Sequence, residues 1–188
     1  MDVTTTKAFQ EVDMPGGDNP TLLEGSCFCA KVRIRAKTNM PYPFMVCHCI
    51  SCRKTGGAYC VKLAADKESL KVEGREHVKS YRGSTEIATE RFFCGTCGSM
   101  LWGEDNRYPQ RIYPAASCLD TDIPRAPEEH HVMAKYKQSY LRLPTDYKGI
   151  DVEVYPENGA KTRETWHTDN SLFGKAGDDM EKIALFSS

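Results

Sequence analysis

Short runs of alternating apolar and polar residues dominate the chain between about residue 22 and residue 118. The clearest run covers residues 31–36, where Val32 and Ile34 alternate with basic residues and are expected to face a core. Turn signals at Gly74 and at 83–84 separate the runs that follow. Further strands are expected at residues 58–65, 70–72, 77–81, 86–93 and 111–113. The pattern therefore predicts successive short strands, most of them antiparallel.

The two ends of the chain lack the regular strand pattern of the middle part. Residues 1–21 are polar and interrupted by proline and glycine, so we expect a flexible lead-in before a domain over residues 22–145. After Pro124 a polar break at 127–129 precedes a possible last strand at 131–134, and residues 136–143 are expected to pack back on the core. Residues 146–188 form an extension that we expect to pack on or near the domain. It offers an edge strand at 150–155 and a short helix at 178–185.

Charge and hydropathy exclude several classes of partner. The 188 residues include 25 basic and 26 acidic side chains, which gives a formal net charge of -1. Such a balance produces no field that draws the protein to nucleic acid or to a lipid surface. No apolar run is long enough to span a bilayer, and residues 1–20 lack the apolar core of a secretory signal. We therefore expect a cytoplasmic protein without nucleic-acid or membrane partners.

Nine cysteines in such a chain require an explanation, because disulfides are disfavoured in a reducing compartment. Seven of them fall in three clusters: Cys27 and Cys29, then Cys47, Cys49 and Cys52, then Cys94 and Cys97. Cysteines separated by one or two residues bend around one ion, and zinc accepts four thiolates in a tetrahedron. The clusters therefore predict bound zinc, whereas Cys60 and Cys118 are expected to be small buried hydrophobes.

Seven ligands are one fewer than two complete four-cysteine sites require. One ion is then closed by four sulfurs and the other is held by three, which leaves an open position typical of catalytic zinc. Alternatively a histidine completes the second site and both ions are structural; the candidates are His48, His77, His130 and His131. Spacing alone leaves the partition open. Two C-x-x-C pairs would join Cys49, Cys52, Cys94 and Cys97, and the alternative joins Cys27, Cys29, Cys94 and Cys97.

Three stretches around these cysteines resemble one known family. They are Gly25–Val32, Cys47–Gly57, which includes the run Cys-His-Cys-Ile-Ser-Cys-Arg-Lys-Thr-Gly-Gly, and Phe93–Leu101. Their order and spacing are similar to those of the glutathione-dependent formaldehyde-activating enzyme family, which also includes centromere protein V. The resemblance covers about residues 22–125 and continues more weakly to 144. It implies an all-β, mainly antiparallel fold known as a β-tent, here with a short C-terminal extension.

The resemblance also implies different roles for the cysteine clusters. Cys27, Cys29, Cys94 and Cys97 are implied to form a structural zinc site. Cys47, Cys49 and Cys52 are implied to hold a second, catalytic zinc. The implied activity is that of a carbon–sulfur lyase, which forms or breaks the adduct of a thiol such as glutathione with an aldehyde. The alternative is a non-enzymatic interaction module of the centromere protein V type.

Residues near these cysteines supply further candidates. Arg53 and Lys54 directly follow the last ligand and are expected to meet a carboxylate of a glutathione-like thiol. Trp102, Tyr108 and Tyr113 are candidates for a pocket that accepts a larger aldehyde, although aromatic residues near strands are more often core. The family usually has histidine at the position of Phe28 and glycine at that of Ala30, and both positions lie beside implied structural ligands. Exposed edge strands make a homodimer an expectation.

Overall fold

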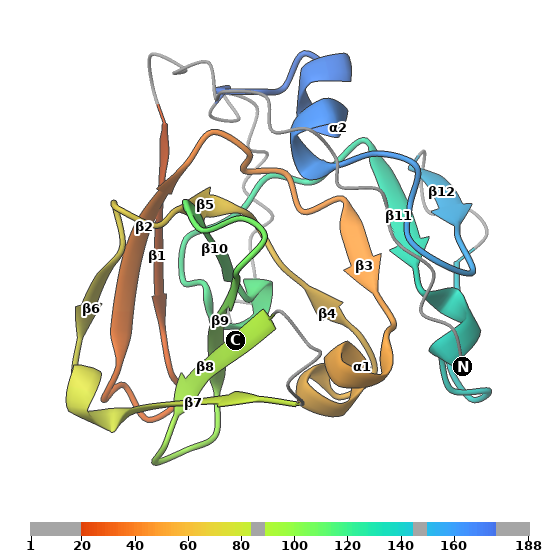
Figure 1. Ribbon diagram of the computed structural model, residues 1–188. Helices are drawn as coiled ribbons and strands as arrows, with labels where there is room; N and C mark the ends of the chain where they lie inside the picture. The colour runs from red at the N-terminus through yellow and green to blue at the C-terminus, as the bar shows by residue number, and fades with distance from the viewer. Residues whose placement is uncertain (1–19, 84–88, 145–149, 176–188) are drawn as a thin grey trace, which may run out of the picture.

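A computed structural model describes residues 20–83, 89–144 and 150–175, and in these ranges the strands form three sheets (Figure 1). The first sheet has the order β1-β2-β6 and is antiparallel throughout. Its strands are β1 (Thr21–Ser26), β2 (Arg33–Thr38) and β6 (Lys71–Glu73). Along β2, Ile34 and Ala36 are buried while the basic residues between them are exposed, which confirms the alternation seen in the sequence.

The second sheet carries the largest share of the strands and has the order β5-β10-β9-β8-β7. Its members are β5 (Ala65–Asp66), β7 (Val78–Arg82), β8 (Thr89–Cys94), β9 (Met100–Asp105) and β10 (Arg111–Pro114). All its neighbouring strands are antiparallel. β9 is covered on both faces, because the neighbouring residues Leu101 and Trp102 are both buried and belong to the main core.

The third sheet has the order β12-β11-β3-β4 and joins the middle of the chain to its C-terminal part. Its strands are β3 (Met45–Cys47), β4 (Cys60–Val61), β11 (Glu128–Val132) and β12 (Asp151–Val154). β11 runs parallel to both β3 and β12, whereas β3 and β4 are antiparallel. The architecture is therefore all-β and mainly antiparallel, with β12 at the edge of this sheet.

Helical elements are short in the described part of the chain. The α-helices are α1 (Ile50–Gly56) and α2 (Arg163–Asp169). Single 3₁₀ turns occur at η1 (Arg75–His77), η2 (Ala116–Cys118) and η3 (Ala134–Tyr136). None of the described helices is both long enough and apolar enough to cross a bilayer.

Two buried clusters hold these elements together. The larger lies between the first and second sheets and includes Leu23, Val32, Trp102 and Ile112. The smaller is formed by Phe44, Ala126 and Trp166, so it joins the segment before β3 to α2. Trp166 stacks on Phe44 with ring centroids 4.1 Å apart and an interplanar angle of 7°. Helix α2 is thus packed on the segment before β3 through an aromatic contact. Figure 1 shows this helix at the top of the view.

Several elements differ from the sequence expectation. The single strand expected at 58–65 is divided into β4 and β5, which belong to different sheets. β11 begins at Glu128, inside the expected polar break, and η3 replaces the end of the strand expected at 131–134. The edge strand expected at 150–155 is present as β12. The expected helix at 178–185 and most of the lead-in over 1–21 lie outside the described residues.

Candidate metal centres

The first group of cysteines joins two turns that are distant in the sequence. Cys27 directly follows β1 and Cys29 is in the turn after it, while Cys94 ends β8 and Cys97 lies in the turn before β9. The four Sγ atoms all lie within 4.8 Å of one another. Two of these separations are 3.5 Å, between Cys27 and Cys29, and 3.8 Å, between Cys29 and Cys94. Four soft donors at this spacing are compatible with tetrahedral zinc.

Backbone hydrogen bonds shape both turns around the sulfurs. The amide of Ala30 donates to the Cys27 carbonyl over 2.8 Å, and Ala30 has a positive φ of 58°. Gly98 repeats this arrangement in the second turn, since its amide donates to the Cys94 carbonyl over 2.8 Å and its φ is 77°. The left-handed residue in each turn reverses the chain, so that the two sulfurs of each pair point inward.

Electrostatics within this group also favour a bound cation. A hydrogen bond from the Ser99 hydroxyl lowers the pKa of the Cys97 thiol to about 5. The backbone N–H of Lys31 acts to lower the pKa of Cys29, but burial and the neighbouring thiols raise it to about 11. Four thiolates so close together repel one another unless a cation lies among them. The donor set therefore fits a metal ion better than four free thiols.

The second group is built around the start of α1. Cys47 ends β3, Cys49 is the N-cap residue of α1, and Cys52 lies in the first turn of that helix. The amide of Cys52 donates to Cys49 Sγ over 3.4 Å. The three Sγ atoms lie within 4.8 Å of one another, and among the described residues no further histidine, cysteine, aspartate or glutamate joins them. This group is compatible with zinc held by three sulfurs.

A half-buried lysine and a fourth thiol lie close to Cys52. The pKa of Cys52 lies far below its usual range because the thiols of Cys47 and Cys49 donate hydrogen bonds to its sulfur. Cys60 and Lys62 act in the same direction. Cys60 lies opposite Cys47 in the β3–β4 ladder and is 7% exposed. The structure therefore places Cys60 beside the three-cysteine group, which the expectation of a lone buried hydrophobe did not foresee.

Two arginines that the sequence did not single out complete these surroundings. Arg163, from α2, donates its Nε–H to the carbonyl of Lys62 over 3.3 Å. Arg91, from β8, donates to the hydroxyl of Ser51 over 2.9 Å and is 5% exposed. Burial lowers the pKa of Lys62, and the Cys52 thiolate opposes that shift. No local motif marks these residues, because strand pairing and the packing of α2 bring them to the site.

A histidine pair lies on the other side of the second group. Nε2 of His48 and Nδ1 of His131 are 2.8 Å apart, and the two rings stack with centroids separated by 5.1 Å. His131 Nε2 lies 3.0 Å from the carboxylate of Glu129. Burial lowers the pKa of both imidazoles. The two histidines therefore pair with each other in the described structure, and none of the four histidine candidates is grouped with the three sulfurs.

The other candidate residues are placed as follows. Arg53 and Lys54 both lie on α1; Arg53 is half-buried, with no hydrogen-bond partner for its Nε among the described residues, and Lys54 is exposed. Trp102 belongs to the main core, where it is 1% exposed and stacks on Phe92 with ring centroids 4.6 Å apart. Tyr113 is half-buried beneath the guanidinium of Arg163, 5.5 Å from its ring centroid.

The remaining sequence candidates lie outside the two cysteine groups. Tyr108 lies beside Arg111, whose guanidinium carbon is 6.0 Å from the centroid of the tyrosine ring. Cys118 is buried in the core, where its thiol donates to the Leu101 carbonyl over 3.2 Å and burial raises its pKa to about 12. That environment is the one expected of a small buried hydrophobe.

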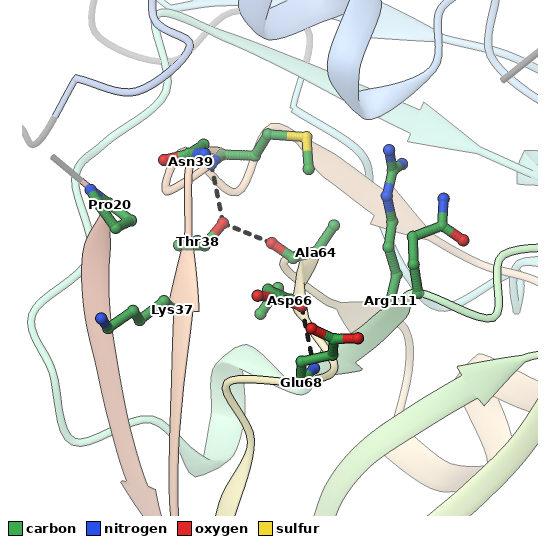
Figure 2. Close-up of a pocket in the computed structure, with 11 residues that line it drawn as sticks. Pro20, Lys37, Thr38, Asn39, Ala64, Asp66, Glu68 and Arg111 are labelled. Atoms are coloured by element: carbon green, nitrogen blue, oxygen red, sulfur yellow. Dashed lines mark hydrogen bonds between the residues drawn. The ribbon is translucent and has the colours of Figure 1, made fainter. Parts of the chain in front are cut away.

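A cavity of about 430 Å³ lies beside β2, β5 and β10 (Figure 2). The Thr38 hydroxyl donates to the Ala64 carbonyl over 2.5 Å and accepts from the Met40 amide over 2.8 Å. The cavity is lined by Pro20, Lys37, Thr38, Asn39, Met40, Ala64, Ala65, Asp66, Glu68, Gln110 and Arg111. None of the seven clustered cysteines contributes to this lining, so the cavity and the cysteine chemistry are separate features.

The chain is similar to several known proteins. Residues 22–136 match the family described as glutathione-dependent formaldehyde-activating enzyme. A Halomonas elongata protein that bears this enzyme's name provisionally is 39% identical over 151 residues, which cover 78% of this chain and 94% of the relative. A solved structure of a Rhodobacter sphaeroides protein matches 55% of this chain and 99% of its own, with a TM-score of 0.46 and 23% identity. By the family match and the Halomonas relative, the chain belongs to the glutathione-dependent formaldehyde-activating enzyme family.

Proposed function

We propose that the protein is a zinc-dependent enzyme of the carbon–sulfur lyase type, which forms or breaks the adduct of a thiol such as glutathione with an aldehyde. The observation that carries the proposal is the group of three thiols, Cys47, Cys49 and Cys52, within 4.8 Å of one another. Family membership supports the same reaction class. The four-cysteine group is proposed to hold a second, structural zinc.

The residues around the three thiols suit this chemistry. Cys47 and Cys49 are half-buried, so the group is accessible from one side, whereas Cys52 is buried. A zinc ion held here supplies a Lewis-acid centre that lowers the pKa of a thiol ligand. Lys62 lies beside Cys52, and its ammonium acts to lower the pKa of the Cys52 thiol.

Residues of helix α1 are proposed to bind the thiol substrate. Arg53 and Lys54 extend from α1 within two residues of Cys52, and their charges complement the carboxylates of glutathione. Gly57 is the C-cap residue of α1 and has a φ of 90°. A Cβ at this position would have no atom within 4 Å, so the surface beside it is open. A ligand is able to approach the backbone closely there.

The test combines spectroscopy with an activity assay. Protein substituted with cobalt is titrated with glutathione, and adduct formation from glutathione and a panel of aldehydes is followed against a buffer control. We expect the wild-type cobalt spectrum to change as the thiol binds. Cys52→Ala should lower the rate of adduct formation at least 100-fold, since it removes one of three metal ligands. Cys118→Ala, which changes a buried cysteine outside both groups, is the control and should keep the rate within twofold.

The assay also separates this proposal from its alternative. Equal rates for wild type and Cys52→Ala with every aldehyde, at or near the buffer rate, would contradict the enzymatic role. That result would instead favour the interaction-module function of the centromere protein V type.

A further inference from the structure

A third cluster of potential metal ligands lies on the paired strands β11 and β12, apart from both cysteine groups. Glu128 and His130 are two residues apart on β11, so their side chains share one face of the sheet. Glu153 on β12 is the register partner of His130. The parallel pairing therefore brings one imidazole and two carboxylates together, and their ligand atoms lie within 4.8 Å of one another.

His130 is a buried imidazole that faces this cluster without a hydrogen bond. The residue is 2% exposed, and neither ring nitrogen has a hydrogen-bond partner among the described residues. Its Nε2 lies 3.3 Å from a Glu128 oxygen and 3.9 Å from a Glu153 oxygen. A buried imidazole normally has a partner, because leaving one polar group unsatisfied costs about 1–3 kcal/mol. A cation between Nε2 and the two carboxylates would supply that partner.

Neighbouring side chains fix the orientation of the three groups. The indole N–H of Trp166 donates to Glu128, and the hydroxyl of Tyr155 donates to Glu153. Phe44 packs edge-on against His130, with ring centroids 5.1 Å apart and an interplanar angle of 89°. Such outer contacts orient the ligands of metal sites. The accepting oxygens are the ones that lie nearest His130 Nε2, and each keeps a second lone pair for an ion.

Charge and access at the cluster also suit a cation. The basic residue Lys161 interacts electrostatically with both carboxylates, but its ammonium is paired with Asp169 at 3.0 Å. The Glu153 side chain is 50% exposed, so an ion has a path of entry from the solvent on the β12 side.

We propose that Glu128, His130 and Glu153 form a third, sulfur-free site for a divalent transition-metal ion. One nitrogen and two carboxylate oxygens form a donor set that suits Zn²⁺, Co²⁺ or Mn²⁺ rather than a soft cation. Glu153 lies beyond residue 136, where the family match ends, so the site depends on this chain's C-terminal segment. A bound ion would link Glu153 of β12 to Glu128 and His130 of β11, and Glu128 in turn accepts the hydrogen bond from Trp166.

The experiment uses the full chain with its cysteine groups loaded with zinc, and Co²⁺ is the added probe. Co²⁺ binds more weakly than zinc, so it does not displace the ions held by thiolates. We expect one Co²⁺ to bind per chain, with the weak visible absorption of nitrogen and oxygen ligation and without thiolate charge-transfer bands. Glu153→Gln keeps the size of a half-exposed side chain and should weaken this binding at least tenfold. Glu157→Gln, the same change at an exposed position in the same segment, should bind Co²⁺ like wild type.

Three results with wild type and Glu153→Gln would overturn the proposal. They are an absence of Co²⁺ binding up to millimolar concentration, binding accompanied by thiolate charge-transfer bands, and equal affinity in wild type and Glu153→Gln. His130→Ala is a second variant, and its zinc content at the cysteine groups reports whether it folds. A folded His130→Ala that still binds Co²⁺ like wild type would count equally against the site.

Discussion

Ala30 has a backbone conformation that glycine adopts at lower cost. Its φ is 58°, and its side chain is exposed in the turn between Cys27 and β2. The left-handed region costs an L-residue roughly 1–2 kcal/mol, a cost that glycine avoids. We expect Ala30→Gly to raise the free energy of unfolding by about 0.5–1 kcal/mol in chemical denaturation of the zinc-loaded protein. Ala160→Gly, exposed and without positive φ, should lower it slightly; stabilisation by both changes would contradict the argument.

His167 makes the stability depend on pH. Burial lowers its pKa to about 4, and the neutral ring accepts from the Tyr42 amide at Nε2 while its Nδ1 contacts the Arg163 carbonyl. Between about pH 6.5 and 4 the unfolded chain binds a proton at this residue that the folded protein does not, so stability falls as pH falls. The shift corresponds to about 3 kcal/mol across this window, with no further loss from this residue below it.

The pH effect is measured by comparing wild type with His167→Gln. Between pH 4 and 6.5 we expect the variant to take up about one proton fewer on unfolding than wild type. The slope of its unfolding free energy against pH should therefore be shallower. Above pH 7 the two slopes should coincide, because His167 is neutral in both the folded and unfolded states there. Equal slopes at acidic pH would show that burial does not hold this imidazole neutral.

At the scale of single residues, the sequence identified the cysteine ligands but not the residues that surround them in the fold. The cysteine clusters marked both groups, but spacing alone left their partition open, and the resemblance implied the grouping that the fold displays. Cys60 was expected to be an isolated buried thiol, whereas β3–β4 pairing places it opposite Cys47. Arg163 lies more than 100 residues from Cys52 in the chain and carries no motif. Only tertiary packing brings such residues together, so no local pattern reveals them.

At the scale of elements, α2 is held chiefly by Trp166. The indole is fully buried, stacks on Phe44 and donates to Glu128. Trp166→Ala removes this packing and leaves a cavity, and such changes cost about 3–5 kcal/mol. We therefore expect a fall of that size in the free energy of unfolding by urea denaturation. Tyr140→Ala removes a 69%-exposed ring and should stay within about 0.5 kcal/mol; equal losses in the two variants would contradict this account of α2.

The elements that the sequence predicted well have a clear period. β2 alternates strictly, and β12 retains an alternating run, so both are readable from the pattern. In contrast, β4 and β5 have two residues each, which is too short for any period to appear. α1 has seven residues, of which only Cys52 is buried, so it shows no apolar stripe. These elements are stabilised by long-range pairing and by the cysteine group rather than by local preference.

At the scale of the whole molecule, the four-cysteine group links two sheets. Cys27 extends from β1 in the first sheet, and Cys94 ends β8 in the second. Both sulfurs belong to the main core, since the residues are 2% and 0% exposed. A metal ion bound by these four thiols would connect the first sheet to the second beside the main core. The three-cysteine group instead joins β3 to α1, which are already neighbours in the sequence.

This difference predicts two separate outcomes of zinc removal. In Cys52→Ala, which weakens the three-cysteine group, we expect one tightly held zinc and a cooperative thermal transition near that of wild type. Stripping that remaining zinc with excess chelator should abolish the transition, because structural zinc contributes directly to folding free energy. In wild type the first equivalent of zinc should leave with little change in circular dichroism, and the second should leave together with the loss of folded structure. A zinc-free protein that melts at the same temperature as the loaded one would show that core packing alone holds the two sheets, and that the four thiols are dispensable for the fold.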